Sequence, residues 1–252
     1  MKKLFVLGLA VFLAAPSYAD LGRQQRVALF VGIDVSGSFH HTGHYPDALA
    51  FLAQYLHAHL LGIGGLEPSK ALFVGSIGGN SKDETKSFHP IEDFKGKSVA
   101  QIQADLKDWF PRSDGLTDFN VFFQQVALIA QKRNLALTPI EIVLATDGIP
   151  DMPGEKTGKI SRVDVTPLEF LSRRVTLRLL YPRPTICTDW ETQVPHTRLR
   201  MWTVDDQVMV GWSSQLKPGA SPRDQDNLWK WVLDNVDFRV RPVKIRTASR
   251  NK

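Results

Sequence analysis

The sequence contains a single cysteine, Cys187, among its 252 residues. One cysteine excludes an internal disulfide bond, so the fold must be stabilised by its hydrophobic core. A chain of this length buries enough apolar surface for one such domain.

Long hydrophobic runs are also absent, except near the start of the chain. Two lysines precede an apolar run over residues 4–15, and Ser17 and Ala19 follow at the small-residue positions of a cleavage signal. This pattern predicts a secretory signal peptide over residues 1–19, because the run is too short to span a bilayer comfortably. We therefore expect residues 20–252 to form one exported domain, periplasmic or secreted, with no stable membrane insertion after cleavage.

No long run of basic residues is present either. The formal net charge of +5 falls to +3 once Lys2 and Lys3 leave with the signal. Arginines do recur through one stretch, separated mostly by apolar and turn residues: Arg173, Arg174, Arg178, Arg183, Arg198 and Arg200. This spacing is typical of a solvated strand face, so we expect no nucleic-acid partner.

Two common catalytic and cofactor motifs are missing. Ser36 does not stand in a G-x-S-x-G elbow, and nothing in the sequence pairs it with a general base. Gly75, Gly78 and Gly79 do not complete a G-x-G-x-x-G nucleotide-binding fingerprint. The sequence therefore predicts a protein that is not an enzyme.

Apolar runs alternate along the chain with segments of helical spacing. Buried strands are predicted at residues 26–33, 71–77, 140–145 and 175–180, and a β-rich stretch at 199–210. Helices are predicted at residues 46–61, 98–110 and 121–130, after a capping box at Thr166 and Glu169, and from Ser221 to Leu233, while 181–195 is read as irregular. Strands alternating with helices predict an α/β fold with a doubly wound, mostly parallel sheet, whose core covers about residues 26–236.

Oxygen-bearing side chains follow two of the predicted strands. Asp34, Ser36 and Ser38 follow the first strand as D-x-S-x-S, Asp147 follows the third, and Thr117 lies in a loop before a helix. Ligands of open parallel sheets bind outside the carboxyl ends of the strands, and alternate residues of an extended loop aim their side chains at one side. Hard oxygen ligands suit Mg²⁺ or Mn²⁺, and Ca²⁺ less well. The alternative is that these residues are ordinary turn and N-cap residues.

These motifs together resemble the von Willebrand factor type A (VWA) domain. The D-x-S-x-S run, a distant loop threonine and the run Thr146-Asp147-Gly148 match that family's metal-ion-dependent adhesion site, over nearly the whole chain after the signal. The resemblance implies a Rossmann-like VWA fold. It also implies metal ligands at Asp34, Ser36, Ser38, Thr117 and Asp147, and a partner carboxylate at the sixth position of the ion.

The sequence therefore predicts an exported module for adhesion or assembly. Its divalent ion would engage an acidic group on a partner, and the loops at residues 39–45, 114–120 and 149–165 would select that partner. The alternative is a structural subunit or assembly factor of a cell-envelope complex, in which the metal only stabilises the loops. The identity of the partner and the oligomeric state stay open.

Histidines and one tryptophan near these loops allow two interpretations each. His40, His41 and His44 form either a softer metal site or a pH-sensitive surface, or they are simply exposed, which is the interpretation we favour. Trp190, beside Asp189 and Glu191, is either a partner contact or buried under its loop. The remaining tryptophans near the end of the chain are expected to pack in the core: Trp202, Trp212, Trp229 and Trp231.

Overall fold

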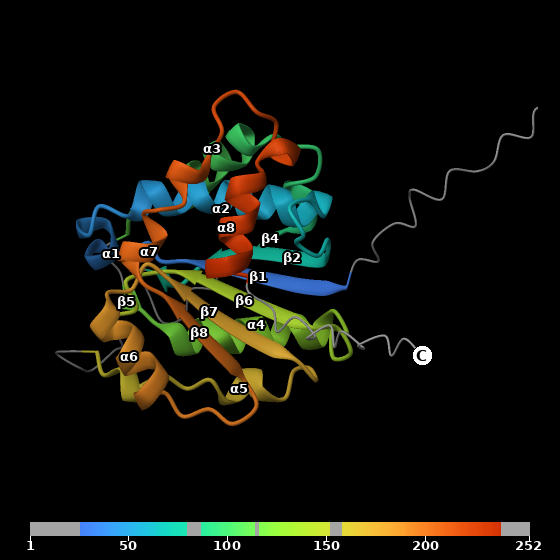
Figure 1. The fold of residues 1–252 in the computed structure, drawn as a ribbon. Coiled ribbons are helices and arrows are strands. Elements are labelled where there is room, and N and C mark those ends of the chain that lie inside the picture. The colour runs from blue at the N-terminus through green and yellow to red at the C-terminus, as the bar shows by residue number, and fades with distance from the viewer. Residues whose placement is uncertain (1–25, 80–86, 114–115, 152–157, 238–252) are drawn as a thin grey trace, which may run out of the picture.

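A computed structural model describes residues 26–79, 87–113, 116–151 and 158–237 (Figure 1). The predicted signal peptide and parts of two predicted partner-selecting loops lie outside these residues. Among the described helices, none combines the length and the apolar character needed to cross a bilayer.

Six strands form one twisted sheet in the order β4-β2-β1-β6-β7-β8. Five of them run parallel, and only the short β4 is antiparallel. The strands are β1 Val27–Ile33, β2 Ser69–Ser76, β4 His89–Pro90, β6 Ile140–Ala145, β7 Val175–Leu180 and β8 Arg200–Val204. A second small sheet pairs β3 (Gly78–Gly79) with β5 (Leu116–Thr117). The predicted fold class is confirmed: this is a mostly parallel α/β sheet flanked by helices.

Helices cover both faces of the large sheet (Figure 1). On one face lie α2 Tyr45–Leu61, α3 Val99–Trp109 and α8 Asp226–Asn235, and on the other lie α4 Phe119–Lys132, α5 Thr166–Glu169 and α6 Pro184–Gln193. The short helices are α1 Gly37–His41 and α7 Asp206–Met209, with 3-10 turns at η2 Ile91–Asp93, η3 Ile160–Arg162, η4 Ser213–Gln215 and η5 Pro222–Asp224.

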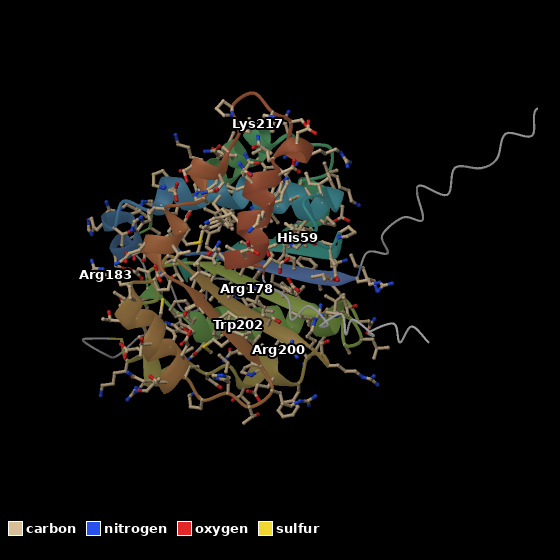
Figure 2. The ribbon with its side chains drawn as sticks, viewed as in Figure 1. His59, Arg178, Arg183, Arg200, Trp202 and Lys217 are labelled. Atoms are coloured by element: carbon tan, nitrogen blue, oxygen red, sulfur yellow. The ribbon has the colours of Figure 1, made fainter. Side chains whose placement is uncertain are left out.

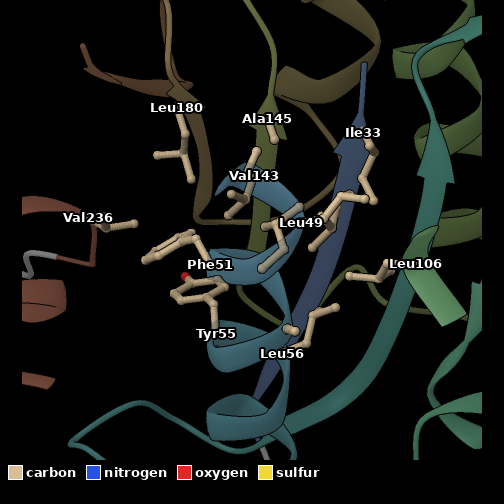
Figure 3. Close-up of a cluster of buried hydrophobic side chains, with 14 of the residues drawn as sticks. Ile33, Leu49, Phe51, Tyr55, Leu56, Leu106, Val143, Ala145, Leu180 and Val236 are labelled. Atoms are coloured by element: carbon tan, nitrogen blue, oxygen red, sulfur yellow. The ribbon is translucent and has the colours of Figure 1, made fainter. Parts of the chain in front are cut away.

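The two faces of the sheet explain why its strands are apolar throughout. Successive side chains of a strand point to opposite faces, so Leu29 and Val31 pack toward α2 while Phe30 packs toward α4. Figure 3 shows the first of these layers, where Leu49 and Phe51 of α2 lie over the sheet near Val143 of β6. Burying each such side chain contributes roughly 1.5–3 kcal/mol, and this core fixes the strand ends that carry the site.

Local predictions succeeded unevenly. The capping box at Ser98 is confirmed, since its hydroxyl accepts from the Gln101 N–H and the Gln101 side chain accepts from the Ser98 N–H. The second predicted capping box is wrong, because the Glu169 carboxylate instead accepts hydrogen bonds from the N–H and hydroxyl of Thr197. The predicted irregular segment at residues 181–195 is mostly the helix α6, which has a proline at its first position.

Candidate metal centre

Three loops are tied together at the carboxyl edge of the sheet. Asp34 directly follows β1, and its N–H donates to the Ala145 carbonyl at the end of the neighbouring strand β6 (2.9 Å). The Ser113 N–H donates to the Val35 carbonyl (2.8 Å), and the Asp151 N–H donates to the Thr117 carbonyl (3.0 Å). The loops that carry Asp34, Thr117 and Asp147 therefore meet at one edge.

Asp34 lies at the centre of this edge and is completely buried. One carboxylate oxygen accepts the Ser36 N–H at 2.9 Å, and the other accepts the Thr146 hydroxyl at 2.6 Å. Burial raises the pKa of Asp34 to about 6, and the negative charge of Asp147 adds to this rise. The two carboxyl groups are thus close enough to repel each other when both are ionised.

The D-x-S-x-S run does not form an extended loop, so that local prediction is wrong. Ser36 is the N-cap of α1, where its hydroxyl accepts from the Phe39 N–H at 3.4 Å, and Ser38 lies in the first turn of the helix. The helical turn still brings the two hydroxyl oxygens to 3.1 Å from each other. The Ser36 hydroxyl therefore caps α1 and also lies beside the Ser38 hydroxyl.

Asp147 approaches the same point from the loop after β6. It is only 4% exposed, and burial raises its pKa, while hydrogen bonds from the Ile149 N–H and the Ser38 side chain oppose the rise. The positive charge of Arg183, labelled at this edge in Figure 2, also lowers the pKa of Asp147. A hydrogen bond between Ser38 and Asp147 thus joins the segment after β1 to the segment after β6.

The loop that carries Asp147 is supported by α6. Gly148 has a φ of +76°, and a Cβ atom there would lie 2.8 Å from the Ile186 side chain. The completely buried Trp190 donates its indole N–H to the Gly148 carbonyl at 2.8 Å. Trp190 therefore lies on α6, is buried under the Gly148 loop and positions the backbone of that loop.

Thr117 is held near the other residues by the small sheet. It pairs with Gly78, where a Cβ atom would lie 3.6 Å from the Val35 side chain of the first loop. Thr117 is 1% exposed, but among the described residues its hydroxyl makes no hydrogen bond to either aspartate. The structure brings Asp34, Ser36, Ser38 and Asp147 into one hydrogen-bonded cluster and leaves Thr117 beside it.

The chemistry of this cluster suits a hard divalent cation. Asp34, Asp147 and the serine and threonine hydroxyls offer only oxygen atoms, which are the ligands of Mg²⁺ and Mn²⁺. Within the described ranges neither aspartate forms an ion pair with a basic side chain. Two buried carboxylates without a paired cation are costly, and a bound cation would offset that cost.

The histidines beyond Ser38 lie on the rim and make separate contacts. The ring of His40 stacks on Tyr45 with centroids 3.8 Å apart, and His44 Nε2 lies 3.7 Å from an Asp206 carboxylate oxygen. These two histidines have different neighbours, and nothing in the described structure gathers them into a shared metal site.

A second buried polar cluster lies at the opposite, amino-terminal end of the strands. The Arg178 guanidinium contacts Glu141 at 3.3 Å and Asp237 at 3.0 Å, and all three side chains are at most 3% exposed. A ring nitrogen of His59 lies within 4.8 Å of both carboxylates, while its Nδ1 lies 2.9 Å from the Glu67 carbonyl. Figure 2 shows Arg178 on the sheet below His59. Our sequence interpretation missed this cluster, although charged residues inside the apolar strands β6 and β7 signalled it.

Comparisons with known proteins add distant structural neighbours only. No protein-family model matches the sequence, and no curated protein does so either. Among solved structures, the chain is similar to proximal thread matrix protein 1 from the mussel byssus (15% identity, TM-score 0.48) and to the pilus adhesin SpaC from Lactobacillus rhamnosus GG (12%, 0.47). Each match covers 83% of this chain, but only 48% and 29% of those proteins. The VWA domain of SpRpn10 is also similar (12% identity, TM-score 0.42), with 79% of this chain and 93% of that domain covered.

Proposed function

We propose that this chain is an exported, metal-dependent protein-binding module of the VWA type. The observation that carries the proposal is the cluster of Asp34 and Asp147, two buried carboxylates that form no ion pair among the described residues. The hydroxyls of Ser36 and Ser38 lie 3.1 Å apart beside them, at the end of the sheet where ligands of such folds bind.

The proposed metal ligands are Asp34, Ser36 and Ser38 from the first loop, Thr117 from the second and Asp147 from the third. Ser38 is exposed and Ile149, which follows the Asp147 loop glycine, is 42% exposed. A bound Mg²⁺ or Mn²⁺ would supply a positive charge at a surface that a partner can reach. An acidic group of the partner would complete the coordination, so that binding depends on the ion.

Binding without catalysis is the activity that these contacts support. The Ser36 hydroxyl accepts from a backbone N–H and contacts the Ser38 hydroxyl, and the described contacts include no imidazole that could activate it as a nucleophile. We therefore assign no catalytic residue.

The experiment is a capture assay with the mature protein as bait. We expect a partner to be retained in Mg²⁺, lost in chelator, and lost with Asp34→Ala even in Mg²⁺. Asp108→Ala is the matched control, since Asp108 is exposed on α3 and is not one of the proposed metal ligands. Capture that ignores both chelator and Asp34→Ala would contradict a metal-dependent module. A fixed complex that survives chelation would instead support the structural-subunit alternative.

A further inference from the structure

Strand β8 ends the sheet, and among the described residues no strand pairs with its outer side. The Val204 carbonyl accepts the Tyr181 N–H at 3.0 Å, so the main-chain groups of Val204 point toward β7. Because these directions alternate along a strand, the main-chain groups of Trp202 also point to β7, and those of Met201 and Thr203 point to the free side. In the part of the chain that the structure describes, no hydrogen bond uses these outward groups of Met201 and Thr203.

On β8 itself, two side chains of one face are exposed, those of Arg200 and Trp202. Figure 1 shows α2, α3 and α8 on one face of the sheet, with β8 at the end of the strand order opposite to β4. Trp202 is 38% exposed, and Figure 2 labels it close to Arg200 on this side. Trp202 lies beside Arg178 in the strand register, and Arg178 is buried and ion-paired. Trp202 is thus an exposed residue of the last strand beside a buried neighbour, and the expectation that Trp202 is a core residue is wrong.

Positive charge and a second aromatic ring lie near the start of β8. Arg173, Arg198 and Arg200 are exposed, and among the described residues they form no ion pair. The Arg198 guanidinium lies 5.4 Å from the centroid of the Phe170 ring, which is 71% exposed. Arginine and aromatic side chains are the residues most enriched in the centres of protein interfaces.

We propose that the free edge of β8 binds an extended acidic segment of a partner protein by strand addition. The main-chain groups of Met201 and Thr203 pair with the added strand, and Arg198 and Arg200 attract its carboxylates. Trp202 packs against an apolar side chain of the same segment.

The positive charge and free main-chain groups of this edge favour an acidic peptide segment over a second copy of the chain and over a nucleic acid. A second copy of the chain would bring two arginine-bearing edges together, which like-charge repulsion opposes. A nucleic acid would satisfy the arginines but has no peptide groups to pair with Met201 and Thr203. This surface uses residues separate from the proposed metal ligands, so the inference does not rest on the proposed function.

The test measures fluorescence anisotropy of a labelled nonapeptide, Glu-Thr-Glu-Thr-Val-Thr-Glu-Thr-Glu, titrated with the full chain; its glutamates and its central valine lie on one face of an added strand, as Arg200 and Trp202 do on β8. We expect saturable binding that persists in chelator and in Asp34→Ala. Thr203→Pro removes an outward N–H that β7 does not use, and should weaken binding about tenfold or more. Thr203→Val also loses the hydroxyl bond to Glu191 but keeps the N–H, so its binding should stay within about twofold of wild type.

Charge is tested separately. Arg200→Glu should weaken peptide binding several-fold, while Lys107→Glu, an exposed reversal on α3, should leave it unchanged. Absence of peptide binding, or equal binding by Thr203→Pro and Thr203→Val, would overturn the proposal. So would tighter binding of single-stranded DNA than of the peptide, or sedimentation that shows a dimer abolished by Thr203→Pro. Circular dichroism of each variant establishes that it is folded.

Discussion

Two pairs of buried carboxylates lie at opposite ends of the same sheet, and they are compensated differently. At the amino-terminal end, the Arg178 guanidinium contacts both Glu141 and Asp237. At the carboxyl end, Asp34 and Asp147 have hydroxyl and amide hydrogen bonds but no ion pair among the described residues. The first pair carries its own cation, so it can serve the fold alone. The second pair lacks one, which is why we propose that it binds a cation from solution.

The largest expected effect comes from removing the internal cation. Arg178→Met removes the cation that contacts both Glu141 and Asp237, and leaves Glu141 only the half-exposed Arg174 at 3.8 Å; breaking a buried pair in this way typically costs about 3–5 kcal/mol of the free energy of unfolding. Arg200→Met, on the exposed side of the neighbouring strand, should cost less than about 0.5 kcal/mol. Urea unfolding measures both. Equal losses for the two variants would show that the amino-terminal cluster does not stabilise the fold.

The next effect comes from adding an external cation. At a Mg²⁺ concentration of about 100 times Kd, binding should raise the free energy of unfolding by roughly 2.7 kcal/mol. Asp34→Ala should abolish this gain, and the exposed control Asp108→Ala should keep it. Thermal unfolding with and without Mg²⁺ provides the measurement. If Mg²⁺ still raised the free energy of unfolding of Asp34→Ala, the ion would have to bind elsewhere than at the carboxyl edge of the sheet.

A smaller effect concerns pH in the metal-free protein. Because folding raises the pKa of Asp34 from 3.8 to about 6, the folded state binds more protons than the unfolded state between these values. Stability should therefore fall as pH rises from about 4 to 6 and stay low above, by about 1–2 kcal/mol. Asp34→Asn, which cannot ionise, should lose this part of the dependence in chelator. Identical pH profiles for the two proteins would contradict the raised pKa of Asp34, which comes mainly from its burial.

Sequence reasoning found the strands because a parallel sheet covered on both faces needs nearly continuous apolar runs. The bounds of β6 and β7 agree with the predicted ranges, and so does the position of Asp34 and Asp147 directly after neighbouring strands. The helix α6 was missed because Pro182 and Pro184 suggested breaks, whereas Pro184 occupies the first turn, where proline is favoured.

The amino-terminal cluster could not be assembled from the sequence. Its members come from α2, β6, β7 and the residue pair after α8, and only the tertiary fold brings them together. A glutamate and an arginine inside otherwise apolar strands were the available signal, because buried charges are normally paired. The sequence did not show that Glu141 and Arg178 would form an ion pair with each other.

The most direct test of the account counts bound metal. The protein is equilibrated with Mn²⁺, passed through a desalting column, and analysed for manganese per chain by mass spectrometry. We expect a single ion in the wild type and in Glu141→Gln, and almost none in Asp34→Ala. Manganese that remains in Asp34→Ala but disappears in Glu141→Gln would contradict the account, since it would assign the ion to the cluster that already contains a cation.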